Sequence, residues 1–75
     1  RKAMERNEIG SPLMGRLASV LVEAGDEVDK DTPVFVIEAM KMETTITAPY
    51  ASTIRKVYLE AGELLAQGDL VIELE

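Results

Sequence analysis

Two stretches of this chain repeat one pattern: residues 20–28 read Val-Leu-Val-Glu-Ala-Gly-Asp-Glu-Val, and residues 57–65 read Val-Tyr-Leu-Glu-Ala-Gly-Glu-Leu-Leu. The same offset of 37 residues places residues 11–38 over residues 48–75, with seven identical positions. Self-similarity at a fixed offset indicates two copies of one structural unit. The identical pairs are Pro12/Pro49, Val20/Val57, Glu23/Glu60, Ala24/Ala61, Gly25/Gly62, Val34/Val71 and Glu38/Glu75.

Each copy has the composition of short strands separated by turns. Leu13, Leu17 and Val20 also fall at helical spacing, so a helix is an alternative for this segment. However, Gly15 and Gly25 bracket only nine residues, a length that is marginal for a helix and usual for a strand. We therefore predict an all-β fold, a flattened barrel or sandwich of two four-stranded antiparallel sheets with an internal pseudo-two-fold repeat.

The later apolar runs give clearer strand signals. Residues 34–37 and 70–74 are rich in β-branched and aliphatic side chains, and residues 42–47 predict a polar strand with three threonines. Alternation along the last run predicts which side chains face the core. Leu70, Ile72 and Leu74 should point inward, and Val71, Glu73 and Glu75 should point outward.

Composition narrows the classes of function. The 75 residues fit one small domain, and they include no cysteine and no histidine. Disulfide and thiolate chemistry are therefore excluded, together with the commonest general base and metal ligand. The net charge of −6 opposes binding to nucleic acid, and the longest apolar run is far shorter than a membrane span. We expect neither a nucleic acid nor a membrane as a partner.

The segment that links the two copies, residues 38–45, has no counterpart in either copy after Glu38, and it contains Met40-Lys41. If a two-fold axis relates the copies, this hairpin and the chain termini lie at opposite ends. Two-residue hairpin turns favour positive φ, which Asn-Gly or Gly normally supplies. Met40-Lys41 would therefore hold some strain, which is tolerable at a functional position. The alternative is an ordinary solvated Lys41 between core residues Met40 and Met42.

The hairpin segment, Glu38-Ala39-Met40-Lys41-Met42-Glu43-Thr44, resembles the biotin attachment motif of biotin-dependent carboxylases and decarboxylases. The core of that motif is Ala-Met-Lys-Met, and its lysine carries biotin. Further segments resemble the same family, so the resemblance covers residues 8–75. They are Ser11–Gly15, Ala24–Val28, Ala48-Pro49 and Gly68–Leu70.

Within the family, residues 1–3, 7–10 and 42–46 are most similar to the C-terminal domain of pyruvate carboxylases. The chain departs from the family at Met14, where a proline is frequent, and at Ala51-Ser52, where Asp-Gly is frequent. It also lacks the extra loop that some acetyl-CoA carboxylase carriers insert. The resemblance assigns residues 8–75 to a carrier domain, and we expect residues 1–7 to be the end of an interdomain linker.

The resemblance implies that biotin is amide-linked to the Nζ of Lys41, with Ala39, Met40 and Met42 as motif flanks. A biotin protein ligase would attach it. The lysine-linked biotin, which we call the arm, would receive a carboxyl group at a biotin carboxylase domain that uses ATP, magnesium and bicarbonate. It would then deliver the carboxyl group at a carboxyltransferase domain. In pyruvate carboxylase the acceptor is pyruvate and the product oxaloacetate. The chain alone would not be catalytic, and its parent enzyme would be cytoplasmic, or mitochondrial in a eukaryote.

Three alternatives remain at this point: a carrier from another biotin enzyme such as propionyl-CoA carboxylase or a decarboxylase, a lipoyl carrier, and an interaction domain without modification. Glu38 and Glu43 could act as an acid–base pair, but we favour contacts with partner proteins. The acidic run of residues 26–31 lacks the glycine and final glutamate of a calcium loop, so we expect no metal site. We expect the other three lysines to be solvated surface charges: Lys2, Lys30 and Lys56.

Overall fold

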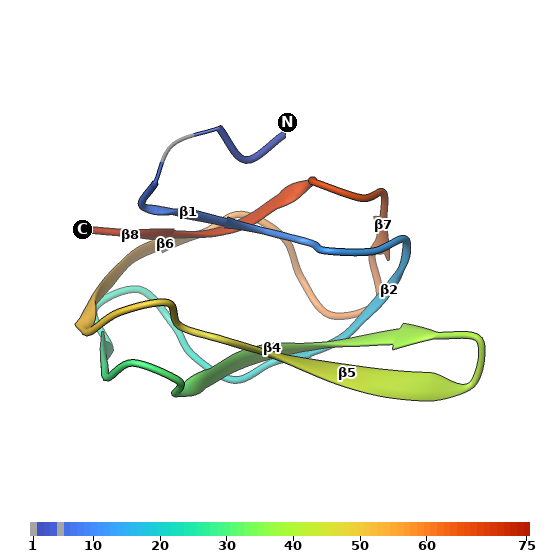
Figure 1. Ribbon diagram of the computed structural model, residues 1–75, viewed down its shortest axis with the longest axis horizontal. Coiled ribbons are helices and arrows are strands. Elements are labelled where there is room, and N and C mark those ends of the chain that lie inside the picture. Colours follow the sequence, from blue (N-terminus) through green and yellow to red (C-terminus); the bar gives the residue numbers. More distant parts are fainter. Residues whose placement is uncertain (1, 5) are drawn as a thin grey trace.

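The computed structural model describes residues 2–4 and 6–75, which form eight strands in two four-stranded antiparallel sheets (Figure 1). Within these residues there is no helix, and hence none able to cross a membrane. One sheet has the order β1-β8-β6-β3 and the other β5-β4-β2-β7. The predicted all-β fold is thus confirmed, and β2 replaces the alternative helix. The strands are β1 (Glu8–Gly10), β2 (Gly15–Val20), β3 (Glu27–Val28), β4 (Pro33–Ala39), β5 (Met42–Thr47), β6 (Ser52–Val57), β7 (Leu64–Leu65) and β8 (Leu70–Leu74).

The sequence repeat is also a repeat of topology. Adding 37 to the bounds of β2 and β3 gives those of β6 and β7, and β4 starts 37 residues before β8. In the two strand orders, β5 of one sheet takes the place that β1 has in the other, and β4 takes the place of β8. The two sheets therefore have the same arrangement of equivalent strands. Each sheet takes its short last strand, β7 or β3, from the other half of the repeat. The halves are therefore interlocked, since each sheet is complete only with a strand from the other half.

The Glu-Ala-Gly turns join one copy to the other. The Gly25 amide donates to the Ile54 carbonyl at 2.8 Å, and the Gly62 amide donates to the Leu17 carbonyl at 2.7 Å. Leu17 and Ile54 are themselves repeat partners. Their amides return bonds of 2.8 Å to the carbonyls of Glu63 and Asp26. The stretch that repeats most clearly in the sequence is therefore the one that connects the two halves.

The core lies between the sheets and takes equivalent side chains from each half. Burial of a large aliphatic or aromatic side chain stabilises the fold by about 1.5–3 kcal/mol. The fully buried large residues are Leu17, Phe35, Ile37, Ile54, Ile72, Leu74, Val34 and Val71.

The burial of Val71 corrects the prediction that it points outward. Gly10 pairs with Leu70 and Ile9 pairs with Ile72, so Val71 is an extra residue in β8. Such a bulge interrupts the alternation of faces and lets adjacent side chains point into the core. Its repeat partner Val34 is the corresponding extra residue of β4 and is buried equally.

The leader packs onto the domain where the structure describes it, outside residues 1 and 5. The Ala3 amide donates to the Gly68 carbonyl, and Asn7 exchanges two bonds with Leu74. Lys2 pairs with Asp69 at 2.9 Å. The boundary at residue 8 stays a prediction. The C-terminus lies at the end opposite the β4–β5 turn, as expected, whereas the leader turns back along β8 (Figure 1).

Candidate functional site

The β4–β5 turn consists of Met40 and Lys41 alone, since β4 ends at Ala39 and β5 begins at Met42. Their φ angles are 52° and 66°. Two successive positive φ values are the signature of the tight hairpin turn whose twist matches the flanking strands. The expected strained turn is confirmed, because neither residue is glycine.

The β4–β5 turn forms one end of the long axis of the molecule (Figure 1), and Lys41 within it is exposed to solvent. Met40 is 94% exposed and Met42 is 72% exposed, so the alternative that both are core residues is wrong. Ala39 is half-buried at the base of the turn. No hydrogen bond or ion pair within residues 2–4 and 6–75 engages the Lys41 amine. The amine is therefore accessible to a modifying enzyme.

The antiparallel pairing of β4 with β5 continues up to the turn and supports it. Ala39 pairs with Met42, and the next pair is Glu38 with Glu43. Like charges directly opposite each other in a sheet are destabilising. Arg16 compensates, because its Nη2 lies 2.6 Å from Oε1 of Glu38. Sequence reasoning missed Arg16, since only the register of β2 on β4 places it opposite Glu38.

Gly15 is the second supporting residue. A Cβ at this position would lie 2.6 Å from the carbonyl oxygen of Glu38 and 3.1 Å from the Cβ of Ala39. Only glycine lets β2 approach the base of the hairpin this closely. The sequence singled out Gly15 as a family glycine but gave no physical reason for it.

An apolar surface surrounds the base of the turn, and sequence reasoning did not find it. Met14 is 75% exposed and Leu64 is 82% exposed, and both line an open hollow of about 460 Å³ with Met40 and Ala39. Isolated exposed apolar residues are common, but a cluster beside an accessible lysine is a contact surface of the kind partners use. We call Met14, Met40 and Leu64 the tip surface.

The other residues considered from sequence lie away from the tip. The Lys2 ammonium is held by Asp69 and the Gln67 carbonyl, and the Lys56 ammonium lies 4.7 Å from the Tyr58 ring centroid. Both are thus engaged rather than only solvated, while Lys30 is exposed. In the acidic run, Asp26 accepts a bond from the Glu23 amide. Among the described residues, no three histidine, cysteine or acidic groups gather as metal ligands.

Several known proteins are similar to this chain in sequence and in fold. The family model described as "Biotin-requiring enzyme" matches residues 7–74. Mitochondrial pyruvate carboxylase of Mus musculus is 43% identical over 93% of the chain, and the mitochondrial propionyl-CoA carboxylase alpha chain of Homo sapiens is 42% identical over 87%. The chain spans only 6% and 9% of those relatives.

Among solved structures, the urea carboxylase of Kluyveromyces lactis aligns with all of this chain at a TM-score of 0.86 and 28% identity, over 7% of its own length. The family model covers nearly the whole chain, and the relatives share more than two fifths of their aligned residues with it. The chain therefore belongs to the biotin/lipoyl family of biotin-requiring enzymes.

Proposed function

We propose that this chain is the carrier domain of a biotin-dependent carboxylase and that biotin is amide-linked to the Nζ of Lys41. The observation that carries the proposal is a lysine that no other described residue engages, in a two-residue turn at the end of the domain, flanked by two exposed methionines. The site fits the group, because Lys41 is exposed and the two methionines beside it are exposed as well. Bound biotin would supply a ureido nitrogen that carries the carboxyl group.

The residues of this chain would position the arm rather than perform chemistry. The β4–β5 ladder and the Arg16–Glu38 pair hold the turn, so the origin of the arm is fixed relative to the domain. The lysine side chain and the biotin tail together reach roughly 12 Å at ordinary bond lengths. The domain itself measures 31 × 21 × 17 Å. Active sites on separate domains would therefore require the whole carrier to move on its linker, with tethering keeping its effective concentration high.

The tip surface would make the contacts with the enzymes that act on the arm: a biotin protein ligase, a biotin carboxylase domain and a carboxyltransferase domain. Methionine is unbranched and polarisable, so Met14 and Met40 can adapt to several different partners. Glu38 and Glu43 would add polar contacts that weaken with salt, as repeated docking and release require.

Pyruvate carboxylase is the parent enzyme that we favour, with pyruvate as the acceptor and oxaloacetate as the product. The support is the 43% identity with a pyruvate carboxylase over most of the chain. An acyl-CoA carboxylase is the second candidate, supported by the 42% identity with the propionyl-CoA carboxylase alpha chain. The parent would work in the cytoplasm, or in mitochondria in a eukaryote.

Intact mass after incubation with a biotin protein ligase, ATP and biotin tests the attachment site. We expect one biotin per chain and none on the Lys41→Arg variant, whose melting temperature should match the wild type because the side chain is exposed and unengaged. Lys56→Arg is the matched control and should be labelled fully. Labelling of Lys41→Arg, or a second biotin on the wild type, would refute the assignment.

A further inference from the structure

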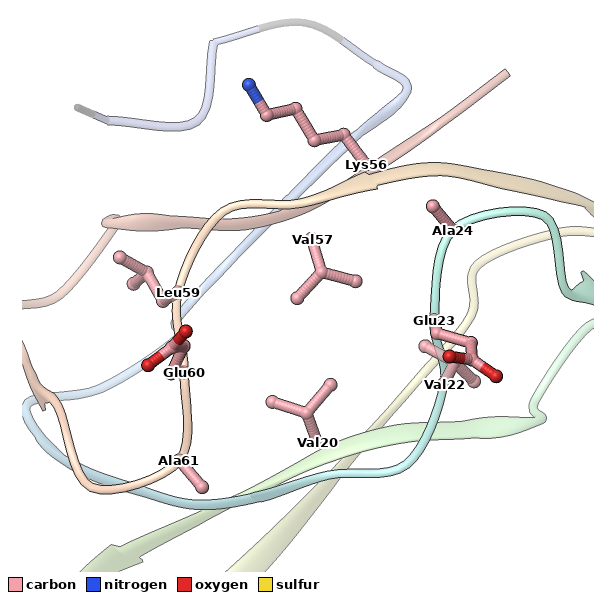
Figure 2. A pocket seen from close by; sticks show the side chains of 9 residues that line it. All are labelled: Val20, Val22, Glu23, Ala24, Lys56, Val57, Leu59, Glu60 and Ala61. Carbon is pink, nitrogen blue, oxygen red and sulfur yellow. The ribbon is translucent and has the colours of Figure 1, made fainter.

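A second surface lies away from the tip, between the two Glu-Ala-Gly turns. It is an open groove of about 470 Å³, with Val20 and Val22 on one side and Val57 and Leu59 on the other (Figure 2). These four side chains are half-buried and pack with their inner surfaces against the core. Their outer surfaces form an apolar floor that no described side chain covers.

The groove is built symmetrically. Val20 and Val57 are repeat partners, and so are Val22 and Leu59. The pseudo-two-fold axis therefore relates one wall of the groove to the other. Val20 and Val57 end β2 and β6, and the turns that follow these strands are bonded across the two halves, so the groove is a preformed feature of the folded domain.

Two carboxylates stand on opposite sides of this floor. Glu23 and Glu60 are exposed, and neither carboxylate has a hydrogen bond or ion pair among the described residues (Figure 2). Among the described residues that line the groove, Lys56 is the one cation; it extends away from the floor, and its ammonium lies over the Tyr58 ring. The groove therefore combines an apolar floor with two unneutralised negative charges, in a chain whose net charge is −6.

The two negative charges beside the apolar floor indicate which kind of molecule binds in the groove. A second copy would bring the same two glutamates against the first pair, and like charges oppose such contact. We propose that the groove binds a segment of a partner protein in which one aliphatic side chain lies between two basic residues. The aliphatic side chain covers the valine and leucine floor, and the basic residues pair with Glu23 and Glu60. This inference does not depend on the modification of Lys41.

The position of the groove would allow a partner protein to hold the domain there while the β4–β5 turn stays free. Its loops lie near the middle of the long axis, whereas the β4–β5 turn forms one end (Figure 1). A partner segment seated in the groove would retain the domain without covering Met40 or Lys41. The tip would stay free to enter a second protein surface.

The experiment is a nuclear magnetic resonance titration of the whole 75-residue chain with the acetylated, amidated peptide Gly-Lys-Leu-Arg-Gly. We expect amide shifts at Val20, Val22, Val57 and Leu59, and none at the tip. The peptide Gly-Lys-Ser-Arg-Gly should bind at least tenfold more weakly, because it lacks the aliphatic side chain. The double variant Glu23→Gln/Glu60→Gln should weaken binding of the leucine peptide about fivefold, as expected for the loss of two exposed ion pairs.

The matched control is Glu27→Gln/Glu75→Gln, which removes the same charge at exposed positions outside the groove and should change the affinity less than twofold. Absence of groove shifts at millimolar peptide would overturn the proposal, as would shifts confined to residues 40–42 or equal weakening by the two double variants. Sedimentation equilibrium completes the test. Self-association of the wild-type chain that competes with the leucine peptide for the groove would identify a second copy as the occupant and overturn the proposal as well.

Discussion

Among the described residues, five turns pass through positive φ. In one of them Asp31 has a φ of 70°, and the Thr32 hydroxyl accepts a bond from the Asp29 amide. The other four turns divide into two kinds. Three of them place glycine at the strained position, with φ of 97°, 99° and 88° at Gly25, Gly62 and Gly68. In each of the three, the acidic residue after the glycine accepts a bond from the backbone amide three residues earlier: Asp26 from Glu23, Glu63 from Glu60, and Asp69 from Ala66. The β4–β5 turn has neither feature, because Met40 and Lys41 adopt positive φ without glycine and without a capping carboxylate.

The difference separates turns that stabilise the fold from the turn that presents a side chain. Glycine adopts positive φ at no steric cost, and a capping carboxylate satisfies an amide that the turn leaves unpaired. A glycine at position 41 would relax the β4–β5 turn but would remove the amine. At the β4–β5 turn, where an amine must project, the chain retains a strain of about 1–2 kcal/mol per residue, and it avoids this strain at the three glycine turns.

The largest effect that we expect concerns the base of the strained turn. Gly15→Ala should lower the free energy of unfolding by about 2 kcal/mol, because the new Cβ would meet the Glu38 carbonyl oxygen and one strand must shift. Thermal unfolding followed by circular dichroism measures it. The repeat partner Ser52 is the control, since that position already carries a Cβ, and Ser52→Ala should cost at most about 1 kcal/mol for one exposed hydrogen bond. If the two variants melt together, the close approach at Gly15 has no energetic role.

The glycine turns come next. Gly25→Ala and Gly62→Ala should each lower the free energy of unfolding by about 1–2 kcal/mol through backbone strain alone, since a Cβ at either site meets no atom within 4 Å. The two losses should agree within about 0.5 kcal/mol, because the turns are repeat partners with the same bonds. Urea unfolding provides both values. Unequal losses would show that the pseudo-symmetry of the backbone does not extend to its energetics.

Replacing the functional turn by a structural one should have a smaller and opposite effect. Met40→Asn with Lys41→Gly should raise the free energy of unfolding by about 1 kcal/mol, because Asn-Gly suits two successive positive φ values. The variant should accept no biotin. Met40→Asn alone keeps the amine and should give part of the gain, with slower labelling by the ligase. A destabilised double variant would mean that Met40 and Lys41 fit this turn without strain.

The smallest effect that we expect concerns the third capping carboxylate. The Ala66 amide lowers the pKa of Asp69 below the ordinary 3.8, and the hydrogen bond from Lys2 lowers it further. A carboxyl whose pKa is lower in the folded state stabilises the fold above the unfolded pKa, and this contribution is lost as the pH falls through the folded pKa. Asp69→Asn should therefore destabilise the domain at pH 7, and the difference from wild type should shrink below about pH 3.8. Melting curves at pH 7, 4 and 2 check this, with the exposed Asp29→Asn as control; a difference that is constant with pH would rule out the carboxylate as its source.

The sequence by itself determined the repeat, the all-β class and the position of the tip. The offset of 37 residues predicted the equivalence of β2 with β6 and of β3 with β7, because segments with the same sequence pattern adopt the same local structure. It also isolated residues 38–45 as the linking segment, which has no repeat partner after Glu38, and Met40-Lys41 as an unusual turn. These are local properties of composition and spacing, so they can be inferred without knowing which strands pair.

Only the tertiary structure decided what depends on register and on contacts across the sheets. Arg16 supports Glu38 because β2 pairs with β4 in one register out of several that the sequence allows, and a shift by one residue would turn Arg16 to the other face. Val71 is buried because a bulge, which no spacing rule locates, adds a residue to β8. Gly15 and the groove floor between Val20 and Val57 depend likewise on segments distant in sequence that approach closely. Such pairings are set by the packing of the whole core rather than by any one segment, which is why the sequence located the lysine but not the residues that support it.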